Sequence, residues 1–293
     1  MSDRNGEGLV KSKKLINDFI GDLLCGDIKK LDNFSFLNLN TNEKYHQFEV
    51  KPKYIYKYGS YNKIGAKFVP HSYKYEDYDD MNIVRAINYV LYHDRLPNLK
   101  WDDFEWEFNS FDDLKPRDYR GDTINSFHTL INEDLYKTYF EDVKSVPNII
   151  EMIDEFLYFA FSIGNFMLLP NIFIGNQTLN MYRGCYLGDY FDLFLNHLKN
   201  GTNDKINEYI KINKGICDLS DFDKFIKGNY LDCYVNNGEI DFYLSDHLKQ
   251  RYSNSYDKEE YAKFVKEYIE KASDKIRTRA VTIRKELSEK LNS

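Results

Sequence analysis

Three short stretches of the sequence place arginine, asparagine and aspartate side chains beside apolar ones, and they are the best candidates for chemistry. They read RDYRGDTINSF (117–127), IGNFMLLP (163–170) and TLNMYRGCYLGDYFD (178–192). Guanidinium groups bind phosphate and carboxylate oxygens through paired hydrogen bonds, and asparagine amides can complete such a pocket. We therefore predict one ligand-binding cluster with these members: Arg117, Arg120, Asp122, Asn125, Asn165, Asn180, Arg183, Asp189 and Asp192.

The same residues also allow a structural interpretation, in which the cluster specifies the fold and binds nothing. Asp122 then caps a helix and pairs with Arg120, while the asparagines satisfy backbone groups at turns. Arg183 then fixes a loop by bridging to Asp189 or Asp192. The sequence leaves both interpretations open.

Motifs of several common enzyme classes do not occur in the sequence. GxSxG, GxxxxGK[ST] and GxGxxG are missing, which disfavours a serine hydrolase, a P-loop enzyme and a Rossmann dinucleotide-binding fold. The four cysteines form no CxxC pair and the six histidines no HxH, HExxH or HxxxH pair, so we predict no metal site and no cofactor. His128, three residues after Asn125, and Asp122 are the candidates for a catalytic base or acid.

Composition and charge are those of an ordinary globular protein whose charges are unevenly distributed. Of the 293 residues 42% are hydrophobic and 30% are charged, and the formal net charge is −7. Residues 101–160 hold 15 acidic and 5 basic side chains, whereas residues 271–290 hold 7 basic and 3 acidic ones, so this last segment is a candidate contact for nucleic acid. No stretch has the roughly 18–20 apolar residues of a membrane span, and the first residues are polar. We therefore predict a cytoplasmic protein without a membrane partner.

Hydrophobic spacing predicts a mainly helical chain. Helices are expected at 9–24, 81–93, 122–142, 147–162, 188–199, 204–213, 220–228, 239–250 and 257–291, and a strand is expected at 45–58. Asp122 or Thr123 would cap the third helix, and Pro147 would occupy the first position of the fourth. Apolar residues nearly surround the helix 147–162, so it is expected to be the central buried one. The helix 257–291 has an apolar stripe that would pack on the body, with its basic residues facing outward.

We therefore predict a mainly α fold of the α+β type. It is a single globular domain, 1–293, with a bundle-like helical core, a small N-terminal β element and a long C-terminal helix. If the helices 122–142 and 147–162 pack antiparallel, Asp122 and Ser162 lie near the same end, and the residues after Ser162 bring Asn165 there. The predicted ligand cluster would then form a polar pocket over an apolar floor.

The order of several segments resembles a family of uncharacterised bacterial proteins, a domain of unknown function. GDTINSF, IGNFMLLP, TLNMYRG, DYFDLFLNHL and IDFYLSDHL follow that family's order of DTxNSF, apolar GN/GG…P, TxNxxRG and DxFDL segments. The sequence departs from the pattern at Asn165, where a second glycine is common, and at Tyr190, where an arginine would precede the phenylalanine. The resemblance covers roughly residues 115–250. It implies a shared fold and a shared site but no reaction, with 1–110 as a variable part, 111–256 as the family-like core and 257–293 as a basic amphipathic helix.

The stretch IGNFMLLP is also similar, more weakly, to the GN-L-LL segment of the HNH-like nuclease domain in GmrSD-type restriction enzymes. Those domains have an upstream D/E-H-I motif whose histidine activates water. The chain has no such motif, because His71 lies in VPHSY and His128 lies in SFHTL.

Three functions remain open at this point. The first is an interaction or regulatory protein of a mobile-element or phage-defence context, which binds a protein partner or a small anionic ligand through the predicted cluster. The second is a metal-dependent nuclease or nucleotide-processing enzyme, in which Asp122, Asp189 and Asp192 hold Mg²⁺ and His128 is the base. The third is a structural subunit that assembles through the apolar stripe of the helix 257–291.

Overall fold

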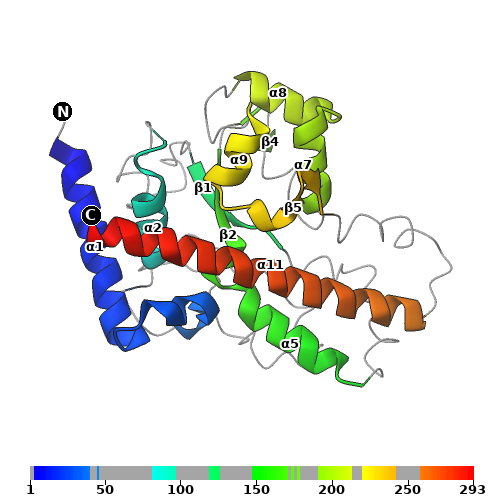
Figure 1. Ribbon diagram of the computed structural model, residues 1–293, viewed down its shortest axis with the longest axis horizontal. Helices are drawn as coiled ribbons and strands as arrows, with labels where there is room; N and C mark the ends of the chain where they lie inside the picture. Colours follow the sequence, from blue (N-terminus) through cyan, green and yellow to red (C-terminus); the bar gives the residue numbers. More distant parts are fainter. Residues whose placement is uncertain are drawn as a thin grey trace.

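The helix α11 (Lys258–Asn292) runs across the molecule, and the other elements pack along it (Figure 1). The computed structural model describes residues 3–39, 45, 81–96, 119–125, 147–170, 173–174, 177–178, 191–212, 220–241 and 258–293. Apolar side chains recur along α11 every three or four positions, so they form a continuous buried stripe. Its members are Tyr268, Ile269, Ala272, Ile276, Ala280, Ile283 and Leu287. The stripe gives a helix of 35 residues one face that belongs entirely to the core.

Several elements contact α11 directly. They are η1 (Ile28–Asn33), α2 (Asn82–Tyr92), α5 (Ile149–Ala160) and η10 (Ile163–Asn165), with a smaller contact from η11 (Asp232–Tyr234). The central buried helix is therefore α11, and the prediction that this place belongs to the helix 147–162 is wrong. That helix is amphipathic, because Glu151 is exposed while Phe156 packs its ring against Tyr268, with centroids 5.5 Å apart.

The start of α5 also differs from the expectation. Pro147 precedes the helix instead of forming its first position, and Asn148 adopts a left-handed conformation with φ of 65° before the helix begins. The apolar pattern located the helix, whereas the proline suggested a start two residues too early.

The N-terminal helix α1 (Asp3–Leu24) packs against α2 beside the C-terminal end of α11 (Figure 1). The short helix η2 (Phe36–Leu39) follows η1. Phe19 of α1 lies in an aromatic cluster with Phe34, Phe36 and Tyr45, with ring centroids 5.2–6.2 Å from that of Phe19. This cluster fills the angle between α1 and the segment that follows it.

The strands β1 (Tyr119–Thr123) and β2 (Phe166–Pro170) form an antiparallel pair. In its register Asp122 is opposite Met167, and Thr123 is paired with β2 as well. The prediction that Asp122 or Thr123 caps a helix is therefore wrong. The segment DTINSF begins as a strand because β2, more than forty residues later, supplies the partner.

Two further strand pairs are short. The strands β3 (Phe173–Ile174) and β4 (Gln177–Thr178) form one antiparallel pair, and β5 (Val235–Asn236) and β6 (Glu239–Ile240) form the other. The helix predicted over 239–250 does not begin at residue 239, because that residue belongs to β6. Residues 242–250 lie outside the described ranges.

The remaining helices agree with the spacing of the sequence. They are α7 (Phe191–Asn200), α8 (Asp204–Ile212) and α9 (Phe222–Gly228). Asp221 caps α9 through its side-chain oxygen, which accepts a hydrogen bond from the backbone of Lys224. In Figure 1 these helices and α5 lie on either side of α11.

Helices dominate the described part of the chain, so the prediction of a mainly α fold with a long C-terminal helix is confirmed. The described strands form small antiparallel pairs. The predicted strand from residue 46 to 58 and the continuation of the predicted helix from 126 to 142 fall outside the described residues. None of the described helices is at once long enough and apolar enough to cross a bilayer.

Candidate functional site

Asn125 and Asn165 form a buried amide pair, here called the asparagine lock. The side-chain oxygen of Asn165 accepts hydrogen bonds from the backbone nitrogen of Asn125 at 2.7 Å and from its Nδ2 at 3.3 Å. The Nδ2 of Asn165 donates to the carbonyl oxygens of Asn125 at 2.9 Å and of Ala160 at 2.8 Å. An amide side chain offers two donor hydrogens and two acceptor lone pairs. All four are used in the lock, so Asn165 has no group left for a ligand.

The position of the lock follows from the end of the β1–β2 pair. The register finishes at Thr123 and Phe166, and the amide of Ile124 still reaches the carbonyl of Asn165 at 2.7 Å. Beyond that point the two backbones separate, so the buried backbone groups of Asn125 need other partners. The side chain of Asn165 provides them and also ties the strand pair to the end of α5.

Tyr234 extends the lock toward α7. Its hydroxyl oxygen lies 3.0 Å from the Nδ2 of Asn125, which donates the hydrogen bond, and its ring packs edge-on against Phe191 with centroids 5.1 Å apart. Phe191 is the first residue of α7, and Asp192 follows it with a fully buried side chain. The Oδ1 of Asp192 accepts from the backbone nitrogen of Leu193 at 2.7 Å.

Arg279 of α11 lies against the other side of the same region. Its side chain is 1% exposed, and its Nη1 donates to the carbonyls of Gly164 at 2.8 Å and Phe166 at 2.6 Å. Its Nε donates to the carbonyl of Asn229 at 3.0 Å. Within the described residues this guanidinium thus donates to backbone oxygens, and its buried Nη2 has no hydrogen-bond partner there. A buried charge without a counter-charge is uncommon in proteins.

Two more cationic side chains donate hydrogen bonds to carbonyl groups of the segment 228–233, which Arg279 also contacts. Lys275 donates to the carbonyl of Cys233 at 2.9 Å, forms an ion pair with Asp241 at 2.5 Å and lies over the Tyr234 ring, 5.2 Å from its centre. Arg95 donates to the carbonyl of Gly228, at the end of α9. The carbonyls of Gly228 and Asn229, at the end of α9, therefore face the guanidinium groups of Arg95 and Arg279, a favourable arrangement where a helix ends.

Cys233 lies within this cationic surrounding without becoming reactive. Burial raises the pKa of its thiol to about 11, and the opposite pull of Arg279 and Lys275 is smaller. At neutral pH the thiol keeps its proton, so Cys233 is a poor nucleophile.

Sequence reasoning missed Arg279 and Lys275 because both were expected to face outward. The signal was present, since Arg279 is three residues after Ile276 and four before Ile283, inside the apolar stripe. A charged residue at such a position is directed into the core.

The predicted cluster is described in part. The side chains of Asn125, Asn165 and Asp192 are all buried, and the first two contact each other. Arg120 and Asp122 occupy β1, where the structure describes their backbone pairing with β2. The other predicted residues lie outside the described ranges: Arg117, His128, Asn180, Arg183 and Asp189.

A metal site cannot be built from the described residues, because none of their His, Cys, Asp and Glu side chains gather in groups of three or more with suitable geometry. The magnesium hypothesis depends on Asp189 and His128, which are not among those residues. It therefore stays a prediction.

The C-terminal helix does not present its basic residues as expected. Of the seven in 271–290, Lys275 and Arg279 are buried, and Arg284 and Lys290 pair with carboxylates of other elements, Asp32 at 3.1 Å and Asp94 at 2.9 Å. The expectation that these residues face outward is wrong for all four. The apolar stripe of α11 is likewise covered by the chain's own elements, so it offers no free apolar face over its buried positions.

Comparison with known protein families shows that residues 64–283 match a family of unknown function (DUF6994). The match spans about three quarters of the chain. The chain belongs to this family. A search of curated proteins and a search of solved structures each found no match.

The DUF6994 match is wider than the resemblance seen in the sequence, which covered roughly 115–250, and it confirms the prediction of an uncharacterised family. It includes the asparagine lock, Tyr234 and Arg279. The comparisons add nothing to the similarity with GmrSD-type nuclease domains, which stays a prediction.

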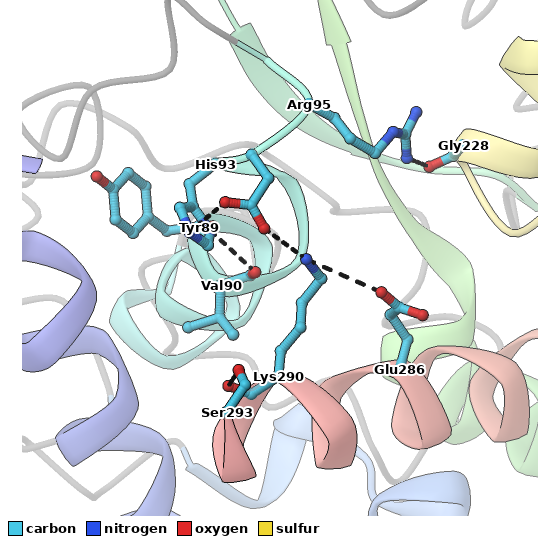
Figure 2. A network of polar contacts seen from close by, with 9 residues as sticks. Tyr89, Val90, His93, Arg95, Gly228, Glu286, Lys290 and Ser293 are labelled. Carbon is cyan, nitrogen blue, oxygen red and sulfur yellow. Dashed lines mark hydrogen bonds and ion pairs between the residues drawn. The ribbon is translucent and has the colours of Figure 1, made fainter. Parts of the chain in front are cut away.

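A polar network connects the DUF6994 region to residues beyond it (Figure 2). Lys290 donates to Asp94 at 2.9 Å, and the other oxygen of Asp94 lies 2.8 Å from the Nε2 of His93. The Nδ1 of His93 lies 3.2 Å from the carbonyls of Tyr89 and Val90. Both ring nitrogens of His93 therefore face oxygen acceptors of the fold, and neither is directed at a substrate.

Proposed function

We propose that the protein is a binding protein that recognises an anionic group beside the β1–β2 strand pair. Arg120 and Arg183 would bind the phosphate or carboxylate oxygens, and Asp122 and Asn180 would bind neighbouring polar groups of the same ligand. The anionic group belongs either to a small molecule or to a protein partner.

The Tyr234 bridge is the observation that supports this proposal. Asn125 belongs to the first of the three polar stretches, Asn165 to the second, and Phe191 to the third. The hydroxyl of Tyr234 bonds to Asn125, and its ring packs on Phe191. Anchor points of all three stretches thus meet at one interior position, as a single ligand site formed by these stretches requires.

The roles within the site differ from those predicted from the sequence. Asn165 has its amide fully used and Asn125 bonds to both Asn165 and Tyr234, so these two residues form the frame of the site. Asp192, fully buried at the start of α7, is also assigned to the frame. The arginines of the cluster are the residues assigned to the ligand.

Thermal unfolding tests the proposal. Inorganic phosphate, adenosine 5′-monophosphate and succinate would be added to the wild type and to Arg120→Ala and Arg183→Ala variants, with Lys285→Ala on the exposed face of α11 as a matched control. A ligand at roughly 100 times its Kd stabilises the native state by about 2.7 kcal/mol, which is readily seen as a higher midpoint. We expect an anion to raise the midpoint of the wild type and the control but not of the two variants.

Two results would overturn the proposal. One is that no anion, small or carried on a phosphorylated or acidic peptide, raises the wild-type midpoint. The other is that both arginine variants respond as fully as the control. A response limited to the peptides would identify a protein partner as the source of the anionic group.

We further propose a regulatory function for this binding, in a mobile-element or phage-defence context. The support for this setting is the sequence resemblance described above. Plaque formation on cells that express the wild type or Arg183→Ala tests it, and we expect protection by the wild type only. Equal protection by both would separate any defence function from the site.

A further inference from the structure

We propose that the turn after α2 is a pH-sensitive element of the fold, in which the protonated ring of His93 holds the turn in its ordered form. Acidification through the range in which histidine titrates then strengthens the turn, and alkaline pH weakens it. None of the residues of the proposed anion site takes part, so the two proposals stand or fall separately.

Both nitrogens of the His93 ring face oxygen atoms. The Nε2 lies 2.8 Å from the Oδ1 of Asp94, and the Nδ1 lies 3.2 Å from the carbonyl oxygens of Tyr89 and Val90 (Figure 2). A neutral imidazole carries one N–H, so in either tautomer one nitrogen would present its lone pair to an acceptor. The imidazolium ion has an N–H on each nitrogen and satisfies both sides. These contacts therefore favour the protonated ring.

The position of His93 on its helix acts in the same direction. His93 is the C-terminal cap of α2, and its backbone N–H donates to the carbonyl of Tyr89. The last carbonyls of a helix carry a partial negative charge, which favours a cation beside them. The unfolded chain lacks both the ordered helix end and the fixed carboxylate of Asp94. Protonation of the ring therefore stabilises the folded chain.

Other charges near the ring oppose this effect only in part. Lys290 of α11 donates to Oδ2 of Asp94 at 2.9 Å, and Lys13 of α1 adds to the positive potential at the same carboxylate. Glu286 lies 3.9 Å from Lys290 and offsets part of its charge. The carboxylate contacts the ring of His93 directly, whereas Lys290 contacts the other oxygen of that carboxylate. Because a charge acts more strongly at shorter distance, the attraction to Asp94 dominates.

The turn controlled in this way holds two other elements. Asp94 binds Lys290 near the end of α11, and Arg95 donates to the carbonyl of Gly228 at the end of α9 (Figure 2). Both anchoring side chains follow His93 directly in the sequence. The protonation state of His93 thus controls the order of a turn to which α9 and α11 are both attached.

Urea unfolding of the full chain at about pH 5.5 and about pH 8 tests the inference, because these values lie on either side of the range in which histidine titrates. The hydrogen bond from Lys290 holds the pKa of Asp94 below its ordinary value, so this carboxylate stays ionised at both. A proton bound more firmly by the folded chain adds stability at the lower pH that is lost as the pH rises. We expect His93→Gln to raise the equilibrium constant of unfolding about three-fold more, or beyond, at the lower pH than at the higher.

Two further variants sharpen the comparison. Asp94→Asn should follow the same trend as His93→Gln, because the carboxylate attracts the ring only when the ring is charged. His197→Gln, the same substitution on α7, is the matched control. Burial lowers the pKa of His197, so its removal should cost less at the lower pH, which is the opposite trend.

Hydrogen exchange locates the effect in the turn. After correction for intrinsic exchange rates, the backbone amides of Arg95 and Leu96, which both donate to the carbonyl of Tyr92, should lose protection between the lower and the higher pH. The loss should occur in the wild type and in His197→Gln but not in His93→Gln.

Three results would overturn the inference. One is an equal destabilisation by His93→Gln at both pH values, which would make the ring a neutral packing element. Another is the same trend in His197→Gln, which would assign the effect to histidines in general. If His93→Gln does not fold, a destabilisation by Asp94→Asn that is independent of pH is the third. Anion binding is measured separately, so none of these results affects the proposed function.

Discussion

At the scale of single residues, Asn165 combines more contacts than its size suggests. Its side chain holds the backbone of Asn125 from both the donor and the acceptor side, and it holds the carbonyl at the end of α5. No water is needed to satisfy these groups, because one amide serves as donor and acceptor at the same time. The asparagine is therefore required at this position for the fold, before any ligand is considered.

We expect Asn165→Ala to lower the free energy of unfolding by about 3 kcal/mol or more, because it leaves the buried amide and carbonyl of Asn125 and the carbonyl of Ala160 without that partner. Urea unfolding followed by circular dichroism measures the change. Asn200→Ala is the matched control, since that amide bonds to Asn196 on an exposed helix face and should cost well under 1 kcal/mol. Similar losses for the two variants would contradict the structural role of the lock.

The sequence identified both residues of the asparagine lock but not the contact between them. Asn125 and Asn165 were recognised as members of one cluster because both stand beside apolar residues. Their mutual contact could not be seen, since it depends on the register of two strands separated by more than forty residues. Arg279 is 115 residues along the chain from Gly164, whose carbonyl accepts its hydrogen bond. Its side chain was expected to face outward because its helix is rich in charged residues.

At the scale of elements, Gly164 sets how closely η10 approaches α11. A Cβ at this position would lie 2.0 Å from the carbonyl oxygen of Ile276 and 3.0 Å from the Cβ of Ala280. The backbone of η10 therefore lies directly on the helix, at a contact that only glycine permits. The same approach lets Arg279 reach the carbonyls of η10 and β2.

We expect Gly164→Ala to lower the free energy of unfolding by about 3 kcal/mol or more, because either α11 or η10 must move away. Gly21→Ala is the matched control. Gly21 lies within α1, and a methyl group on its Cα would meet no atom within 4 Å. Alanine there should therefore raise the free energy of unfolding by about 0.5–1 kcal/mol. Chemical denaturation of both variants gives the comparison. Equal effects of the two substitutions would contradict the close packing of η10 on α11.

Helices were easier to predict than strands for a physical reason. The apolar spacing of α5, α7, α8, α9 and α11 is local, so each helix could be located to within a few residues. The strand β1 has the sequence YRGDT, which carries no alternation of apolar and polar residues, and it is a strand only because β2 pairs with it. The identity of the central helix was also missed, since burial depends on what packs around a helix and not on its own pattern alone.

The ion pair of Lys290 and Asp94 joins the end of α11 to the turn after α2 and gives stability a dependence on pH. The hydrogen bond from Lys290 holds the pKa of Asp94 below its ordinary value. A lowered pKa in the folded state means that the pair contributes stability above the pKa of the unfolded chain, and that this contribution disappears as the pH falls through the folded pKa. The carboxylate is 59% exposed, so the contribution stays below about 1 kcal/mol.

We expect Lys290→Met to lower the free energy of unfolding at about pH 5.5, and the difference from the wild type to shrink toward about pH 2.5 as Asp94 becomes protonated. Urea unfolding at a series of pH values measures this difference. Lys285→Met, on the exposed face of the same helix, serves as the control and should show no such trend. A deficit of Lys290→Met that is the same at all pH values would indicate that the ion pair is not its cause.

At the scale of the whole molecule, α11 contacts regions that are far apart in the sequence. Near its C-terminal end it pairs with η1 through Arg284 and with the turn after α2 through Lys290. Near its middle it holds η10 and the end of α9 through Arg279. The two regions share this helix as their common core, so they should unfold together.

We expect Leu287→Ala to lower the free energy of unfolding by about 3 kcal/mol, as for other buried leucines. The substitution should also reduce the protection of backbone amides from hydrogen exchange in both regions. Amide hydrogen exchange read at β2 and at α2 gives the test, because global unfolding exposes both at the same free energy. We expect equal losses of protection in the two elements. A loss confined to α2 would show that α11 joins two independent units.

The order of elements along the chain has a consequence for how the protein is made. Every element that packs on the buried stripe of α11 is translated before the stripe itself, which spans residues 268–287. At roughly 5–20 residues per second, α1 leaves the ribosome tens of seconds before its core exists. During that time the earlier helices expose the surfaces that α11 later covers. Nascent chains of this protein should therefore depend on chaperones that bind apolar segments, and should complete folding only after α11 has emerged.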